Sequence, residues 1–284
     1  MAQSPETHDA RVSWIAQTMR YAVVTSASVL LPTETPKPKS EGWQRAEQLN
    51  REHYGIIIAH MHANKSDSLR VIKRVFRSPI FRIREIFLPI AMHRYKDWYR
   101  LAGIPIHAQV FPVFTKETGR LTQEDPALAK KLKDKYGVDL KDAERSIVIA
   151  RYTKQYINQA IQLLQRAGVE IVAPQGQREG TLTTMTTAIE SIVKRALHQD
   201  IHNIAVLFVG YNIKGVQNYG DEKNESYNLF KKYRFRDGEC LTVDELITKA
   251  DRDEVKLSEI IRGKMEATVP PEYLPTPYVT IKTK

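Results

Sequence analysis

The sequence predicts an α/β fold with a largely parallel central sheet flanked by helices. Between about residue 54 and about residue 212, short runs rich in β-branched residues alternate with longer segments of helical periodicity. Two of these runs lead directly into polar loops, and a helical segment follows each loop. An N-terminal amphipathic helix and a C-terminal helical extension are expected to flank this unit.

The composition is that of a folded protein with an excess of positive charge. The 284 residues include 43 Lys and Arg against 33 Asp and Glu, which gives a formal net charge of +10. This charge favours acidic partners: nucleic acid, an anionic membrane surface or a phosphorylated small substrate. Cys240 is the single cysteine, which excludes an internal disulfide framework and cysteine-rich zinc modules.

Residues 1–42 are expected to form a helix and a proline-rich linker. Between residues 10 and 31, apolar side chains recur at helical spacing with Arg11 and Arg20 off their stripe, which consists of Val12, Ile15, Met19, Val23 and Val24. This helix either packs on the main domain or lies in the plane of a membrane. Residues 32–42 are polar and extended. We expect neither a membrane-spanning helix nor an export signal.

The main domain is predicted to cover residues 43–215. A strand at 54–60 precedes a polar loop and a helix over 68–76, whose expected N-cap is Ser66 or Asp67. A helix near 94–101 and a strand at 106–114 follow. A long helix over about 146–167 then leads to Gly168, the expected C′ residue of that helix.

The rest of the domain repeats the alternation. A strand at 169–173, a loop at 174–180, a helix over 188–197 and a strand at 203–211 come in that order. Residues 216–284 are predicted to form an extension packed on the same domain, with a capping box of Thr242 and Glu245 at the start of a helix. Because ligands of parallel sheets bind beyond the carboxyl ends of strands, the loops after 54–60 and 169–173 are the candidate functional loops.

The first of these loops carries a histidine and an aspartate. His62 leaves the strand end, and Asp67 follows five residues later at the first helical turn. An aspartate at that position can accept a hydrogen bond from one imidazole nitrogen, which leaves the other nitrogen as a general base. The alternative is that Asp67 only caps the helix and His62 is an ordinary loop residue.

The second loop is suited to an anion. Its sequence, PQGQREG over 174–180, combines glycines that permit close backbone approach with Arg178, whose guanidinium matches a phosphate or carboxylate. A plain turn with a solvated arginine is the alternative. A third feature, residues 71–100, interleaves arginines with aromatic residues; it suits a membrane interface, an acyl-chain groove or nucleic acid, or else consists of core aromatics and solvated arginines.

The two loops together resemble the glycerolipid acyltransferases. The resemblance covers residues 54–212 and rests on a strand, an H-x-x-x-x-D motif and a helix, followed roughly 110 residues later by a Pro-x-Gly-x-Arg loop. In that family the histidine is the base, the aspartate orients it, and a Pro-Glu-Gly-Thr-Arg loop binds the phosphate of the acceptor. The resemblance therefore implies catalysis by His62 and Asp67.

The same resemblance implies which residues bind the acceptor phosphate. These are Gln175, Gly176 and Arg178 in the second loop, with Lys116 as the nearest match to a basic residue that the family places after an intermediate strand. Gln175 and Gln177 replace the Glu and Thr of the family loop, and Met61 replaces an Asn before the histidine. The lost carboxylate at position 175 suggests an altered acceptor.

The sequence thus predicts a cytoplasmic, peripherally membrane-associated enzyme of phospholipid biosynthesis. It would transfer a fatty acyl group from acyl-CoA or an acyl carrier protein to a hydroxyl of a glycerol-phosphate or lysophospholipid acceptor, without metal, cofactor or nucleic acid. One alternative is a metal-dependent hydrolase that uses the H-x-H pair His60 and His62 with Asp67, supplemented from His93, His107, His198 and His202. Another is a non-catalytic basic protein that binds membranes or nucleic acid.

Overall fold

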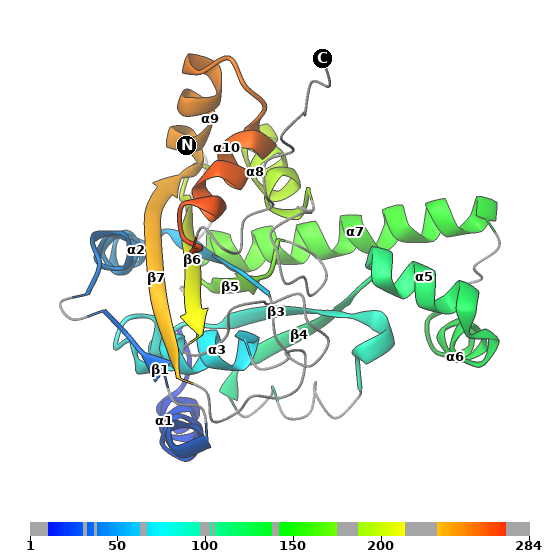
Figure 1. The fold of residues 1–284 in the computed structure, drawn as a ribbon, viewed down its shortest axis with the longest axis horizontal. Helices are drawn as coiled ribbons and strands as arrows, with labels where there is room; N and C mark the ends of the chain where they lie inside the picture. The colour runs from blue at the N-terminus through cyan, green and yellow to red at the C-terminus, as the bar shows by residue number, and fades with distance from the viewer. Residues whose placement is uncertain are drawn as a thin grey trace, which may run out of the picture.

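The computed structural model contains one mixed sheet with helices on both faces (Figure 1). It describes residues 11–30, 33–36, 39–62, 67–96, 103, 106–137, 142–174, 187–213 and 232–270. Within these residues seven strands form a sheet of order β1-β7-β6-β2-β5-β3-β4. The strands are β1 (Thr33–Glu34), β2 (Gly55–His60), β3 (Ile86–Ala91), β4 (Ala108–Val113), β5 (Val169–Val172), β6 (Ile204–Ile213) and β7 (Tyr233–Thr242).

The predicted parallel α/β architecture is confirmed. Strands β4, β3, β5, β2 and β6 run parallel to their neighbours, whereas β7 is antiparallel to β6 and pairs at its far edge with the short β1. The central strand β2 is buried at every residue, as its uninterrupted apolar run predicts for a strand covered on both faces. The four predicted strands correspond to β2, β4, β5 and β6.

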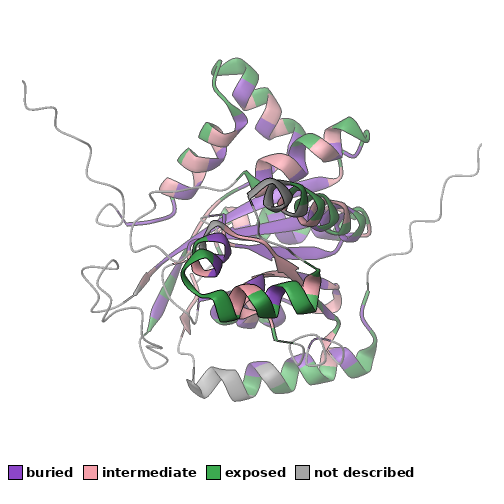
Figure 2. Cartoon of the chain, turned by 90° about the vertical axis from the view of Figure 1, so that its right-hand side faces the viewer, coloured by how far each residue is buried: buried purple, intermediate pink, exposed green. Residues whose placement is uncertain are grey.

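The helices form two layers. On one side of the sheet α2 (Glu41–Arg51) contacts β2, β6 and β7, and α3 (Asp67–Arg77) contacts β5, with α1 (Trp14–Leu30) packed on the outside of α3. The opposite side carries α7 (Asp142–Gln165), α8 (Ala188–His198), α9 (Val243–Arg252) and α10 (Leu257–Glu266). Figure 2 shows the buried residues concentrated in the sheet between these layers. Two short helices, α5 (Lys116–Glu124) and α6 (Pro126–Tyr136), lie beyond β4.

The first helix is buried along a stripe that matches the predicted one only in part. Val12, just before the helix, and Ala16, Arg20 and Val24 are buried, whereas Ile15 and Met19, predicted to share the apolar stripe, are 55% and 40% exposed. The prediction that Arg20 lies off the buried stripe was therefore wrong. Hydropathy alone misplaced the stripe because it treats an arginine as a surface residue.

Arg20 is buried because its guanidinium meets four backbone carbonyls. Nε donates to Ile106 O at 2.7 Å, Nη1 to Arg82 O and Arg84 O at 2.6 and 2.5 Å, and Nη2 to His107 O at 3.2 Å. Burial lowers the pKa of Arg20 to about 10, so the guanidinium stays charged at neutral pH. It joins α1 to the 3₁₀ turn η1 (Phe81–Ile83) and to the segment before β4.

Three strands were absent from the sequence prediction, and the first of them, β1, is a two-residue strand within the segment predicted as a linker. β3 contains Pro89, which argues against a strand interior; β3 pairs with β5 only at Ile86 and Phe87, so Pro89 lies where β4 is the single neighbour. β7 falls in a stretch that reads as charged and irregular, although its residues alternate in burial: Tyr233 and Phe235 face inward, Arg234 outward.

Several predicted helix boundaries differ from those observed. The helix predicted near 94–101 is represented by a 3₁₀ turn, η2 (Met92–Arg94), and residues 97–102 lie outside the described part of the chain. At the end of α7 the left-handed residue is Ala167, with φ of 60°, and not Gly168. Ala167 N–H and Gly168 N–H donate to the carbonyls of Leu164 and Leu163, the two bonds of a Schellman motif. The capping box of Thr242 and Glu245 is confirmed.

The arginine-rich stretch contributes to the core. Phe76, Phe81 and Phe87 are fully buried, which favours core aromatics over a membrane interface for the described part of residues 71–100. Arg74 forms a bidentate ion pair with Asp237 of β7. This pair links α3 to β7, a strand of the predicted C-terminal extension that pairs with β6 in the central sheet.

We expect Arg20→Met to lower the free energy of unfolding by about 3 kcal/mol or more, because it removes a buried guanidinium that donates to four backbone carbonyls. Urea denaturation would measure the loss. Arg252→Met is the matched control, since Arg252 is exposed and pairs with its neighbour Asp253, and a change within about 0.5 kcal/mol is expected there. Equal effects of the two substitutions would contradict the role assigned to Arg20.

Candidate functional site

The candidate site lies at the carboxyl end of β2, the strand at the centre of the sheet. β2 stands between β5 and β6. The chain passes from β2 to β3 through α3 on one face and from β5 to β6 through α8 on the other. Such a reversal of winding direction leaves a crevice beyond the strand ends, where ligands of open α/β sheets bind.

His62 and Asp67 face each other at this point. His62 Nδ1 lies 3.7 Å from Asp67 Oδ2, and the side chains are 23% and 0% exposed. The separation is within ion-pair range and longer than a hydrogen bond; catalytic hydrogen bonds often shorten only when substrate binds. The structure therefore brings together the two residues predicted to form the dyad. In this arrangement Nδ1 of the imidazole faces the carboxylate of Asp67.

A second histidine lies directly behind the pair. The ring of His60 is 6.1 Å from that of His62 and is 1% exposed. Its Nδ1 is 2.7 Å from Met61 O and its Nε2 is 3.4 Å from Ser68 Oγ. Burial, with a contribution from His62, lowers the pKa of His60 to about 4. His60 is therefore neutral at physiological pH, and its contact with a carbonyl assigns the proton to Nδ1.

The carbonyl of Met61 accepts a further hydrogen bond, from Tyr211 of β6. The Tyr211 hydroxyl donates to it at 2.6 Å, and Tyr211 is fully buried. The Tyr211 ring packs on Tyr233 at 5.1 Å, and the guanidinium of Arg70 lies 3.8 Å above the Tyr233 ring. Arg70 is on α3, three residues after Asp67. A continuous set of contacts thus connects the strand end to the first turn of α3.

The helix that begins at Asp67 also brings positive charge to the site. Arg70 and Lys73 lie one turn apart on α3 and are both buried. Burial lowers the pKa of Lys73 to about 8, and repulsion by Arg77 and Arg70 contributes. Burial also lowers the pKa of Arg70, against the attraction of Tyr233 and Asp67. At neutral pH these groups favour an anion nearby.

The other predicted site residues are only partly placed. Gln175, Gly176 and Arg178 lie outside the described residues, but β5, which leads into their loop, is a direct neighbour of β2. Lys116 begins α5 after β4. Because β4 is three strand positions from β2, about 14 Å at normal strand spacing, nothing in the described geometry joins Lys116 to His62.

The described residues give little support to a metal centre. Among them no group of three or more His, Cys, Asp or Glu side chains is arranged to hold an ion. His60, the second ligand of the hydrolase alternative, has its ring nitrogens at Met61 O and Ser68 Oγ. His202, another candidate, lies on the surface between Asp200 and Asp244, at 3.1 and 2.7 Å.

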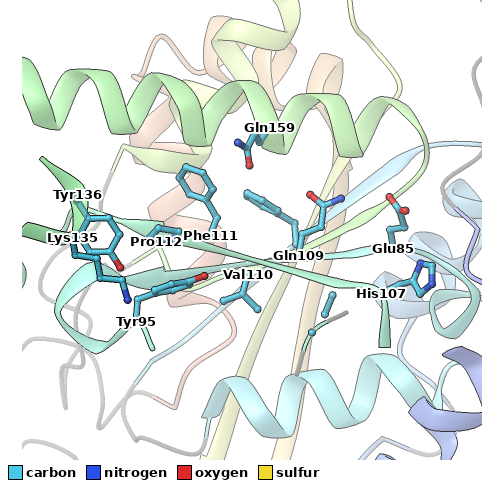
Figure 3. A pocket seen from close by; sticks show the side chains of 13 residues that line it. Glu85, Tyr95, His107, Gln109, Val110, Phe111, Pro112, Lys135, Tyr136 and Gln159 are labelled. Carbon is cyan, nitrogen blue, oxygen red and sulfur yellow. The ribbon is translucent and has the colours of Figure 1, made fainter. Parts of the chain in front are cut away.

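A separate open cavity of about 670 Å³ runs along the edge strand β4 (Figure 3). Lys135 lies between Tyr95 and Tyr136 at one end, with its ammonium 5.3 and 5.5 Å from their ring centres. Glu85 and His107 lie at the other end. The cavity shares no residue with the His62 site; its lining is Glu85, Phe87, Tyr95, Gly103, His107, Ala108, Gln109, Val110, Phe111, Pro112, Lys135, Tyr136 and Gln159.

A buried carboxyl group lies behind the aromatic wall of this cavity. Glu170 of β5 is fully buried and accepts a 2.5 Å hydrogen bond from Tyr156 of α7, whose ring stacks on Phe87 and packs against Phe111. Glu170 Oε2 has no hydrogen-bond partner among the described residues. Burial raises the pKa of Glu170 to about 7. In the folded protein this carboxyl therefore keeps its proton at pH values at which an ordinary glutamate has lost it.

Sequence reasoning missed the residues that support the dyad. Tyr211, Tyr233 and Arg70 come from three elements, and no spacing rule connects them. The H-x-H pattern did single out His60, but as a metal ligand, because alternate strand residues share a face. The contacts of its ring with a carbonyl and a hydroxyl became visible only in three dimensions.

No protein-family model matches the chain, and no curated protein sequence matches it either.

The Glu170 carboxyl predicts a pH dependence of stability. Since its pKa in the folded state is about 7 and an unfolded glutamate titrates near its ordinary value, unfolding releases a proton between about pH 4.5 and 7, and stability falls as pH rises through that window. Glu170→Gln should remove this slope, which is worth up to about 3 kcal/mol.

Urea unfolding of both proteins at pH 4.5, 6 and 8 would measure the difference. His60 contributes a slope of opposite sign below about pH 6.5, because its depressed pKa makes unfolding take up a proton there, but this slope is common to both proteins. A constant difference in stability across the three pH values would contradict the prediction.

Proposed function

We propose that this protein is an acyltransferase that moves a fatty acyl group from a thioester to a hydroxyl of a glycerol-phosphate or lysophospholipid acceptor. The observation that carries the proposal is the His62–Asp67 pair at the carboxyl end of the central parallel strand, with the carboxylate fully buried and 3.7 Å from the imidazole. The sequence resemblance in the two loops supports the same chemistry. The loop with Gln175, Gly176 and Arg178 leaves the strand next to β2.

The reaction follows from the roles that the dyad offers. His62 Nε2 removes the proton of the acceptor hydroxyl as its oxygen attacks the thioester carbon. Asp67 holds Nδ1–H and stabilises the imidazolium that forms. The tetrahedral intermediate collapses, the carbon–sulfur bond breaks, and the imidazolium returns the proton to the thiolate. An ester and a free thiol result, and neither a covalent enzyme intermediate nor a metal is required.

The charge near the dyad suits this substrate class. Phosphate groups occur in both proposed substrates, on the acceptor and on the carrier of the donor. Arg70 and Lys73 on α3 supply positive potential within one or two turns of Asp67, which would attract such groups. Because Gln175 replaces the carboxylate of the family loop, the acceptor has to be identified by experiment.

Replacement of His62 by alanine should lower acyl transfer by about 100-fold or more, because a positioned general base contributes that much. The measurement is release of free thiol from palmitoyl-CoA in the presence of lysophosphatidic acid or glycerol 3-phosphate. Asp67→Asn should also be strongly impaired, since the amide cannot stabilise an imidazolium. The matched control is His202→Ala, which changes a surface histidine and should retain the native rate.

Acceptor-dependent thiol release that is equal in native and His62→Ala proteins would reject the proposed base. Absence of turnover in the native protein with these acceptors, and with lysophosphatidylcholine and lysophosphatidylglycerol, would reject the acyltransferase. Stoichiometric zinc or manganese in the purified protein would then favour the hydrolase.

We also propose that α1 attaches the protein peripherally to a membrane. Among the described residues four large hydrophobic side chains are exposed on this one helix: Trp14, Ile15, Met19 and Tyr21. The helix contains no acidic residue, and Arg20 fixes it to the domain beside α3. No helix in the described part of the chain is both long and apolar enough to cross a membrane, so an in-plane contact is the arrangement that α1 supports.

A Trp14→Ser, Ile15→Ser variant should bind vesicles of phosphatidylglycerol and phosphatidylcholine at least about tenfold more weakly, because it removes two of these four exposed apolar side chains. Vesicle sedimentation would measure the affinity. Ile147→Ser is the control, as Ile147 is 71% exposed on α7, on the other side of the sheet. Equal binding by the variant and the control would reject α1 as the contact.

A further inference from the structure

The backbone immediately before His62 is held by two buried side chains. Met61 N–H continues the sheet ladder and donates to Val209 O at 3.2 Å. Met61 O has left the ladder and accepts from the Tyr211 hydroxyl at 2.6 Å and from His60 Nδ1 at 2.7 Å. A carbonyl oxygen has two lone pairs, so both are used. The peptide that carries His62 is thereby fixed in orientation.

One of the two donors also reaches the other end of the loop. His60 Nε2 is 3.4 Å from Ser68 Oγ, and Ser68 follows Asp67 on the first turn of α3. The His60 ring therefore connects the residue before His62 with the residue after Asp67. Since a ring that donates from Nδ1 accepts at Nε2, both contacts require the same neutral tautomer. The low pKa of His60 keeps that tautomer present at physiological pH.

The second donor, the Tyr211 hydroxyl, is held in place by the packing of its ring. Tyr211 packs against Tyr233, and Tyr233 lies beneath the guanidinium of Arg70 on α3. Tyr211 and Tyr233 belong to the neighbouring strands β6 and β7, where Tyr211 is opposite Phe235 and Tyr233 opposite Ile213, so the two tyrosine rings meet diagonally. The hydroxyl that holds Met61 O is thus fixed within a packed group that also contacts the helix carrying Asp67.

We propose that Tyr211 and His60 are positioning residues for His62, acting through the Met61 carbonyl. This inference rests on the proposed function, in which His62 is the base. A base must lie within hydrogen-bond reach of the acceptor hydroxyl, and a displacement of about 1 Å can cost on the order of 100-fold in rate. Neither Tyr211 nor His60 touches the substrates in this scheme, and their effect is on the orientation and tautomer of the His62 imidazole.

The test compares two tyrosines whose hydroxyl groups each donate a buried hydrogen bond. Tyr211→Phe removes the donor to Met61 O. Tyr156→Phe removes the donor to Glu170, which is also buried but lies under α7. Both substitutions should cost similar stability. Only Tyr211→Phe should lower kcat for transfer from palmitoyl-CoA to lysophosphatidic acid, by about tenfold, with KM unchanged within about twofold.

His60 allows a rescue experiment. In His60→Leu the Met61 carbonyl loses its second donor, and the same fall in kcat is expected. In His60→Asn the side-chain amide can place an N–H near the position of Nδ1, so at least half of the native rate should return. If His60 had a purely structural role, His60→Leu and His60→Asn would differ only in their stability in urea. The kcat of the folded protein would then be the same with and without a side-chain donor to Met61 O.

A readout independent of turnover is the imidazole of His62 itself. Two-bond ¹H–¹⁵N correlation spectra of the labelled full chain report the tautomer of each histidine. The native protein and Tyr156→Phe should show His62 in the Nδ1–H tautomer. In Tyr211→Phe and His60→Leu its ¹⁵N shifts should move toward the tautomer mixture of free imidazole. Unchanged His62 shifts in both variants would overturn the positioning role, whether or not acyl transfer is detected.

The two proposals fail in distinguishable ways. If the native protein lacks acyl transfer but the His62 shifts respond as described, the acyltransferase is rejected and the positioning role stands. If transfer depends on His62 while Tyr211→Phe retains the native kcat and shifts, the acyltransferase stands and the positioning role is rejected.

Discussion

The structure around the candidate site depends on how the backbone of β2 leaves the sheet. β2 is buried along its length and is hydrogen-bonded on both edges. At Met61 this pairing ends inside the protein, where an unsatisfied carbonyl would cost on the order of 1–3 kcal/mol. Two side chains, Tyr211 and His60, satisfy it. The requirement that backbone polar groups be paired thus fixes the peptide next to His62.

The same principle explains how peripheral elements are attached. Arg20 satisfies carbonyls at the turn before β3 and at the start of β4, which ties α1 to the domain. Arg74 reaches Asp237 on β7 and joins α3 to the C-terminal part of the chain. Arginine suits both tasks because it offers five donors in a fixed plane and keeps its charge when buried. Arg74, one of the arginines of residues 71–100, therefore has a structural role.

Two buried groups with shifted pKa values, His60 and Glu170, belong to different regions of the sheet. His60, neutral behind the dyad, is connected to the strand end and to α3. Glu170, beneath α7, is connected to Tyr156 and to the aromatic wall of the β4 cavity. Burial shifts the pKa of each group toward its neutral form. They titrate with opposite effects on stability, so the two sites contribute separately to its dependence on pH.

The sequence by itself determined the alternation of strands and helices, because apolar periodicity and loop composition act over a few residues. It also determined that His62 and Asp67 lie at a strand end and a helix start. It did not reveal β7, whose arginines hid an alternating pattern, nor the buried stripe of α1, which includes Arg20. Those features depend on partners far along the chain. The contacts of Tyr211, His60 and Arg70 with the site were likewise decided by tertiary structure, because only packing brings β6, β7 and α3 together around one carbonyl.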